Sequence, residues 1–122
     1  NEVVILDYKA TSTKENINYV TSSKNYHKSY LRQLDFYAYL LKLNKFKVFK
    51  TGYWILCNAR NENQKTFGDK LNFNINLLSY EINTNYIEDS LVELEKCYSS
   101  DKIPPYSPYC DTCRWHKEAS KF

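Results

Sequence analysis

The 122-residue chain has no methionine, only four cysteines and no long apolar run. A membrane-spanning helix needs roughly 18 consecutive apolar residues, and no segment approaches that length, so we expect no membrane insertion. Nothing has the pattern of a secretory signal, so the expected compartment is the cytosol, and we do not expect a framework of structural disulfides. A complete gene product begins with methionine and this chain begins with Asn1, so we expect a fragment, a processed chain or the ordered part of a longer protein, with its N-terminal part missing.

Arginine is scarce as well, with three residues, whereas asparagine and lysine are frequent. This bias is typical of an AT-rich coding sequence, such as that of a bacterium or its phage. The formal net charge is +3, and residues 24–50 hold seven Lys or Arg against one acid, Asp35, while residues 81–95 hold five acids and no base. The basic stretch predicts a phosphate-binding surface, although two solvated helix faces would give the same pattern.

Hydrophobic periodicity predicts an α/β fold with a mixed sheet, in a single and partial domain over residues 1–122. The first strand is apolar on both faces, which is typical of a central strand covered on both sides. Three prolines predict an irregular C-terminal tail, residues 101–122. The other expected elements are strands at residues 2–9, 51–59 and 71–82, a helix at 24–44, a helix starting near Asn85, and loops at 10–22 and 60–70.

The third predicted strand changes its apolar phase in the middle. Phe73, Ile75 and Leu77 alternate with asparagines, and then Leu78 and Tyr80 take over the apolar positions. A β-bulge, or a change from an edge strand to a covered strand, would explain this shift.

The first strand ends in "DYK", which is Asp7-Tyr8-Lys9. Side chains alternate along a strand, so Asp7 and Lys9 project from the same face where the strand leaves the sheet. A carboxylate at that place can hold a divalent cation, and a neighbouring lysine can stabilise the charge that builds on an attacked phosphate. The alternative is an exposed strand end with a simple ion pair.

The long helix carries "QLDFY", in which Gln33 and Tyr37 lie four residues apart on one face, with Tyr30 close by. A glutamine on the apolar face of an amphipathic helix is unusual. The alternative is a boundary residue that forms a hydrogen bond with a loop.

An apolar strand that ends in D-x-K, a polar loop and a helix with Q-x-x-x-Y together resemble the RecB-like branch of the PD-(D/E)XK nuclease superfamily. The following strand hairpin, the closing helix and a proline-containing tail with C-x-x-C match that family's order, so the resemblance covers nearly the whole chain. The resemblance implies a restriction-endonuclease-like core, with a mixed central sheet flanked by helices. It also implies a divalent-metal-dependent DNA nuclease of an exonuclease-like branch, without separating exonuclease from endonuclease activity.

By this resemblance, Asp7 would be a ligand of Mg²⁺ or Mn²⁺, the backbone carbonyl of Tyr8 could complete the metal shell, and Lys9 would be the catalytic lysine. Gln33 and Tyr37 would orient the scissile phosphate or that lysine. The family also supplies an acid, and often a histidine, from a segment before the D-x-K strand. We therefore expect the fragment alone to be inactive, with DNA as the substrate of the parent protein and no protein partner identified.

The C-terminal "CDTC", with Cys110 and Cys113, matches part of the iron–sulfur pattern of related members. Those members have a further cysteine upstream and another downstream, and the downstream position is near Ala119 here. A cluster needs four good ligands and His116 is a weak candidate, so we expect no iron–sulfur cluster in this chain alone. The alternatives are a vestigial loop with two free thiols and a structural zinc completed by outside residues.

Three functions therefore remain open at the level of sequence. The first is a metal-dependent nuclease in which Asp7 holds the metal and Lys9 acts at the phosphate. The second is a non-catalytic nucleic-acid-binding module that keeps the nuclease fold. The third is a small metal-binding interaction domain built on the "CDTC" tail.

Overall fold

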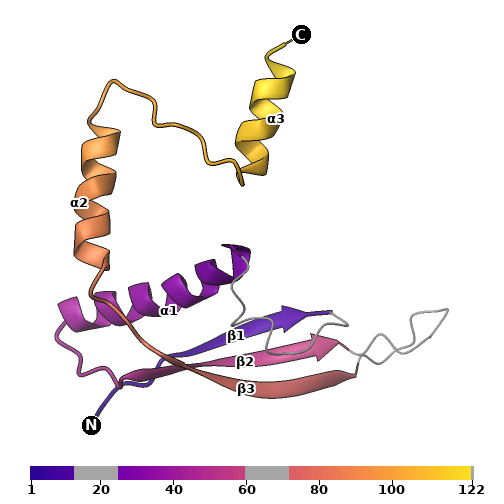
Figure 1. The fold of residues 1–122 in the computed structure, drawn as a ribbon. Coiled ribbons are helices and arrows are strands. Elements are labelled where there is room, and N and C mark those ends of the chain that lie inside the picture. The colour runs from indigo at the N-terminus through magenta and orange to yellow at the C-terminus, as the bar shows by residue number, and fades with distance from the viewer. Residues whose placement is uncertain (13–24, 60–71, 122) are drawn as a thin grey trace. The chain divides into compact units, whose positions relative to one another are not determined.

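The computed structural model describes residues 1–12, 25–59 and 72–121, which form two compact units, Asn1–Ile87 and Glu88–Phe122. The elements confirm the predicted α/β class. The expectation of one partial domain over the whole chain stays a prediction. In chain order the elements are β1 (Leu6–Thr11), α1 (Asn25–Leu43), β2 (Thr51–Ala59), β3 (Phe73–Glu81), α2 (Ile87–Tyr98) and α3 (Asp111–Ala119) (Figure 1).

The strands of the first unit form a mixed sheet in the order β1-β2-β3. β1 runs parallel to β2, and β3 runs antiparallel to β2. A parallel pair needs a crossover connection, and α1 lies in that connection. β2 is the central strand of this sheet, because Trp54 to Cys57 pair with β1 on one edge and with β3 on the other.

One face of this sheet is covered by α1 (Figure 1). Leu34 and Ala38, one turn apart on α1, are fully buried in a cluster with Trp54 and Leu56 of β2 and with Ile5. Burying a large apolar side chain contributes about 1.5–3 kcal/mol, so this cluster is the main attachment of the helix to the sheet.

Gly52 allows the close approach of α1 to β2. A Cβ atom at this position would lie 3.2 Å from Leu34 Cδ1 and 3.3 Å from Ile82 Cδ1, which is tighter than ordinary van der Waals contact. The side chains of the helix and of the segment after β3 thus occupy the space that a larger residue would need.

The C-terminus of α1 closes with a Schellman motif. The backbone N–H of Phe46 donates to the carbonyl of Leu41 at 3.0 Å, and that of Lys45 donates to the carbonyl of Lys42 at 2.9 Å. Lys45 adopts the left-handed conformation with φ 65°, where glycine or asparagine is usual. The motif ends the helix and turns the chain towards β2.

Within the described residues of the first unit, no helix or strand covers the opposite face of the sheet, whereas the sequence predicted cover on both sides of the first strand. The exposed fractions of Leu6 and Tyr8 on β1 are 55% and 61%, and those of Ile75 and Leu77 on β3 are 69% and 63%. β1 is an edge strand of the described sheet, and it spans Leu6–Thr11 rather than residues 2–9. Val3 forms only an isolated bridge with Val48, so the chain joins the ladder later than its apolar run suggests.

The phase shift in β3 occurs without a bulge, because the register with β2 is continuous from Phe73 to Glu81. Leu77 lies on the uncovered face, whereas Leu78 and Tyr80 contact the core under α1. The strand therefore changes which face carries its apolar residues, because only its second half runs beneath the helix.

The predicted loop at 60–70 and most of the loop at 10–22 lie outside the described residues, although β1 continues to Thr11.

The second unit corrects the predicted irregular tail, because Asp111–Ala119 form helix α3. The last proline is Pro108, and two residues later Cys110 caps the helix by accepting a hydrogen bond from the backbone N–H of Cys113 at 3.3 Å. The prolines thus exclude helix only up to the cap. Within the part of the chain that the structure describes, no helix is both long enough and apolar enough to cross a membrane.

Candidate functional site

The site residues of β1 lie on the sheet face that α1 covers. Exposure alternates along β1, so that Asp7 and Lys9 are half-buried while Leu6 and Tyr8 on the other face are exposed. The exposed fraction is 16% for the Asp7 side chain and 19% for that of Lys9. The period of the strand therefore places an acid and a base side by side beneath the helix.

Lys9 is the centre of the site. Its Nζ atom donates a hydrogen bond to Gln33 Oε1 at 2.6 Å and lies 2.9 Å from Asp7 Oδ2. The same atom lies 4.7 Å from the centroid of the Tyr30 ring, within cation–π range. A carboxylate, an amide oxygen and an aromatic face thus hold one ammonium group in a defined position, although Lys9 and Gln33 are 24 residues apart in sequence.

Gln33 connects Lys9 to Tyr37 along α1. Its Nε2 atom donates to the Tyr37 hydroxyl at 2.6 Å. The lysine ammonium can only donate, so the amide oxygen of Gln33 must face Lys9 and its nitrogen must face Tyr37. The Tyr37 oxygen then accepts from Gln33, and its own proton is directed elsewhere. Tyr37 is 40% exposed, so this proton can reach a bound molecule.

The backbone carbonyl of Tyr8 points away from β2. The carbonyls of Val3 and Ile5 accept hydrogen bonds from the backbone N–H groups of Phe49 and Tyr53, each at 2.9 Å. Successive carbonyls along a strand point to opposite edges, so that of Tyr8 points to the edge of β1 where no described strand pairs. The Tyr8 side chain lies on the other face, where a hydrogen bond with the Cys57 side chain raises its pKa.

Asp7 has the chemistry of a metal ligand. Its Oδ2 atom is buried and lies within ion-pair distance of Lys9, but no hydrogen bond of good geometry reaches it from the described residues. Within residues 1–12, 25–59 and 72–121, no group of three or more His, Cys, Asp or Glu could hold a metal ion. Mg²⁺ is often held by one or two carboxylates, waters and a substrate phosphate, so Asp7 and the Tyr8 carbonyl fit such an ion.

Sequence reasoning missed the structural role of Asp35. Its side chain is 2% exposed and accepts hydrogen bonds from the hydroxyls of Tyr80 at 3.1 Å and Tyr86 at 3.0 Å, and from the backbone N–H of Asn83 at 2.8 Å. These contacts connect α1 to the end of β3 and to the segment before α2. They hold the helix that carries Gln33.

A signal for this role was present in the sequence. Asp35 is the one acid in the basic stretch, and it follows Leu34, so it lies at the edge of the apolar stripe of the helix. A buried carboxylate needs several donors, and two nearby tyrosines supply them. Burial, followed by the charge of Asp35 and the hydrogen bond to it, raises the pKa of Tyr80 to about 12 and that of Tyr86 to about 12.

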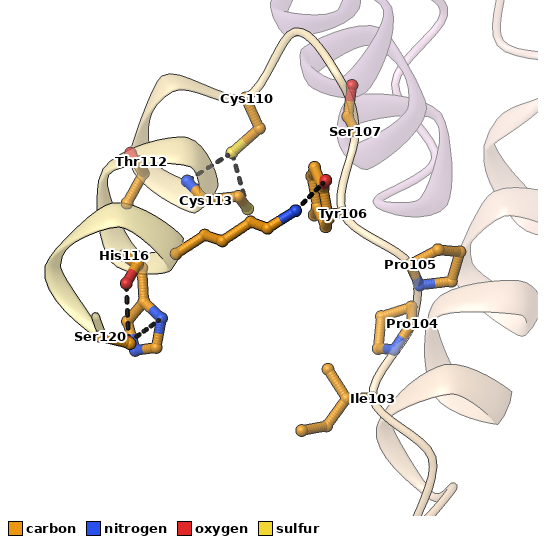
Figure 2. A pocket seen from close by; sticks show the side chains of 11 residues that line it. Ile103, Pro104, Pro105, Tyr106, Ser107, Cys110, Thr112, Cys113, His116 and Ser120 are labelled. Atoms are coloured by element: carbon orange, nitrogen blue, oxygen red, sulfur yellow. Dashed lines mark hydrogen bonds between the residues drawn. The ribbon is translucent and has the colours of Figure 1, made fainter.

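The two candidate ligand cysteines lie in the second unit. Cys110 and Cys113 face a groove of about 850 Å³ between α3 and the preceding segment (Figure 2). Their sulfur atoms are 2.9 Å apart. Hydrogen bonds with Cys113, first with its side chain and then with its backbone, lower the pKa of Cys110, whereas the side-chain hydrogen bond with Cys110 raises the pKa of Cys113. His116 also lines the groove, and its Nδ1 atom lies 3.5 Å from Ser120 Oγ.

Comparison with known proteins identifies one family. The model of the PD-(D/E)XK nuclease superfamily matches residues 1–117, which include all the candidate residues of β1 and α1 and both cysteines. No curated protein matches the chain. No solved structure matches it either.

Proposed function

This chain belongs to the PD-(D/E)XK nuclease superfamily, and on that basis we propose that it acts as a divalent-metal-dependent DNA nuclease of the RecB-like branch. The reaction would be hydrolysis of a phosphodiester bond. The observation that carries the proposal is the continuous contact from Asp7 through Lys9 and Gln33 to Tyr37, which unites the D-x-K and Q-x-x-x-Y motifs.

Lys9 would act at the attacked phosphate. Negative charge builds on the phosphate oxygens during hydrolysis, and a preorganised ammonium group stabilises that charge without having to reorient. Three neighbours support this role, because Asp7, Gln33 and Tyr30 hold Nζ in place before any substrate binds.

Gln33 and Tyr37 would position the lysine and the scissile phosphate. Gln33 accepts from Lys9 and donates to Tyr37, so the orientation of each polar group depends on its neighbour. The remaining Tyr37 proton can be donated to a phosphate oxygen, since the side chain is 40% exposed.

Asp7 and the carbonyl of Tyr8 would hold Mg²⁺ or Mn²⁺. The ion supplies Lewis-acid stabilisation of the negative charge at the phosphate when it is bound. The Asp7 oxygen that faces Lys9 is buried and forms an ion pair with Nζ at 2.9 Å, but it receives no hydrogen bond of good geometry from the described residues, which supports a further role as a metal ligand.

DNA would bind over the basic stretch that includes α1. Lys28, Arg32 and Lys42 on the helix, and Lys45 and Lys50 after it, are exposed. Phosphate contacts of this kind supply affinity that does not depend on sequence and that falls as the salt concentration rises. The substrate backbone would then lie close to Gln33 and Tyr37 on the same helix.

The test is cleavage of linear DNA by the natural full-length protein in the presence of Mg²⁺ or Mn²⁺. Asp7→Asn keeps the size of the side chain and removes its charge, so we expect cleavage to be abolished. Lys9→Ala should reduce turnover by roughly 100-fold or more, in the range of a lost oxyanion-hole donor, with metal affinity retained. Both variants should still bind DNA, because the exposed side chains of Lys28, Arg32, Lys42, Lys45 and Lys50 are unchanged.

The matched control is Asp101→Asn, which makes the same chemical change at an exposed carboxylate and should leave cleavage unchanged. Circular dichroism establishes that each variant is folded. Undiminished cleavage by Asp7→Asn would contradict the proposed mechanism. A wild-type protein that binds DNA without cleaving it would instead support the non-catalytic binding module.

A further inference from the structure

Cys110 and Cys113 lie close together because they are three residues apart at the start of a helix. Cys110 is the N-cap residue of α3 and Cys113 is the third residue of the helix. This is the spacing of a capping box, in which the N-cap side chain accepts from the backbone N–H at the third position and the side chain there reaches back to the cap. Only the first half of that arrangement is present, with Cys113 N 3.3 Å from Cys110 Sγ; the Cys113 side chain instead reaches the cap side chain, with the two sulfur atoms 2.9 Å apart.

The two sulfur atoms are close enough to bond after a small movement. An S–S bond is about 2.05 Å long, so the sulfur atoms would need to approach by roughly 0.9 Å from their separation of 2.9 Å. The amide groups at the start of a helix also stabilise a thiolate, which is the nucleophile in thiol–disulfide exchange. Cys110, at the cap, is therefore the cysteine that would attack first.

The groove gives a small molecule access to this pair (Figure 2). Both cysteines are half-buried rather than enclosed. The volume of about 850 Å³ is in the range of ligand sites that bind small organic molecules. One wall carries Lys117, whose Nζ atom lies 3.2 Å from the Tyr106 hydroxyl and 5.3 Å from the ring centroid, so a cation is available for a carboxylate of the incoming molecule.

We propose that Cys110 and Cys113 are a redox-active dithiol that exchanges with small disulfides and closes to an intramolecular disulfide. This inference does not depend on the nuclease activity, and it differs from a metal-ligand role for the same cysteines. The substrate class is a low-molecular-weight disulfide that carries a carboxylate, for which oxidised glutathione is the probe.

The reaction has two steps. Cys110 releases its proton to solvent, and its thiolate attacks one sulfur of oxidised glutathione, which forms a mixed disulfide and expels one glutathione as a thiolate that takes up a proton. Cys113 then loses its proton to solvent and attacks the Cys110 sulfur, which breaks the mixed disulfide and expels the second glutathione. The protein loses two electrons and two protons, and the small disulfide is reduced to two thiols.

The experiment incubates the intact protein with oxidised glutathione, blocks the remaining thiols with an alkylating reagent, and analyses tryptic peptides by mass spectrometry. Cleavage after Lys102 and Arg114 places both cysteines in one peptide, residues 103–114. We expect this peptide to lose two hydrogen atoms and to take up no alkylating reagent. Cys113→Ser should retain one glutathione on Cys110, because the resolving thiol is absent.

The matched control is Cys97→Ser, which removes an exposed cysteine and should leave the oxidation of the peptide unchanged. Three outcomes would overturn the proposal: a peptide that stays fully alkylatable in oxidised glutathione, a peptide that retains two glutathiones, or a disulfide to Cys57 or Cys97. A purified protein that carries zinc and whose cysteines react only after chelation would overturn it as well, because the pair would then be a metal site.

Discussion

Replacing Asp35 with alanine should be among the most destabilising single changes in the first unit. The substitution removes the acceptor of three hydrogen bonds, from the hydroxyls of Tyr80 and Tyr86 and from the backbone N–H of Asn83. The Asp35 side chain is 2% exposed, so water does not already compete for these donors at the carboxylate.

The magnitude follows from the number and type of these contacts. Hydrogen bonds to a charged group contribute about 1.5–3 kcal/mol each, or about 4.5–9 kcal/mol for three. The two tyrosines are only half-buried, so their hydroxyls can turn towards water after the substitution. We therefore expect Asp35→Ala to lower the free energy of unfolding by about 3–5 kcal/mol. Asp35→Asn should cost about 1–2 kcal/mol, because its oxygen still accepts from Asn83 and its amide can donate to the hydroxyls.

Urea unfolding at neutral pH measures the effect. Trp54 is fully buried and its ring centroid lies 5.6 Å from that of Tyr80, so its fluorescence reports on the core next to the carboxylate. Trp115 is 68% exposed and also fluoresces, so far-UV circular dichroism should be recorded in parallel. The control is Asp101→Ala, which removes an exposed carboxylate and should change stability by less than about 0.5 kcal/mol.

The reasoning would be refuted if Asp35→Ala cost less than about 1 kcal/mol, the mean effect of an arbitrary substitution. The reasoning would also be refuted if Asp35→Ala and Asp101→Ala lowered the free energy of unfolding by the same amount. Either result would show that water replaces the carboxylate at little cost. Asp35 would then not be what attaches α1 to the end of β3.

Two further predictions concern packing and pH. Gly52→Ala should lower the free energy of unfolding by about 1–3 kcal/mol, because the new Cβ would lie 3.2 Å from Leu34 Cδ1 and 3.3 Å from Ile82 Cδ1; an unchanged thermal midpoint would contradict this. The pKa values of Tyr80 and Tyr86, raised to about 12 against a reference of 10.0, mean that the folded state binds more protons than the unfolded state between these values. The contribution of these two tyrosines to the free energy of unfolding should therefore be fully present below pH 10 and should decrease as the pH rises towards 12. Urea unfolding midpoints at pH 9 and pH 11 measure this decrease. A variant with both tyrosines changed to phenylalanine should lose less stability between these two pH values.

Local pattern was sufficient for the elements whose periodicity is strong. β2 has the predicted bounds, residues 51–59, and α1 begins and ends within one residue of the predicted 24–44. Both elements contain long periodic or continuous apolar runs. The spacing of the apolar residues determines whether a helix or a strand can bury them, and therefore which type of element forms. The family resemblance was likewise carried by short motifs in a fixed order, and the family match over residues 1–117 confirms the PD-(D/E)XK nuclease superfamily, while the RecB-like branch stays a prediction.

Other elements depended on partners that are distant in sequence. β1 begins only at Leu6 because its ladder requires a register with β2, and the change of apolar face in β3 reflects how far α1 extends over the sheet. Helix α3 was not predicted, because the prolines before it indicated irregular structure. Its N-terminus is determined by one side-chain cap at Cys110. The bounds and faces of these elements depend on hydrogen bonds to a neighbouring strand and on packing beneath a helix. A single short window of sequence does not contain these partners.

The candidate site shows the same division. The sequence by itself determined that Asp7 and Lys9 share a strand face and that Gln33 and Tyr37 share a helix face, because those relations follow from the periods of strand and helix. Only the tertiary structure decided that the two faces meet, with Lys9 Nζ 2.6 Å from Gln33 Oε1. That contact depends on packing α1 against β2 across Gly52, and packing is a property of the assembled unit rather than of either segment.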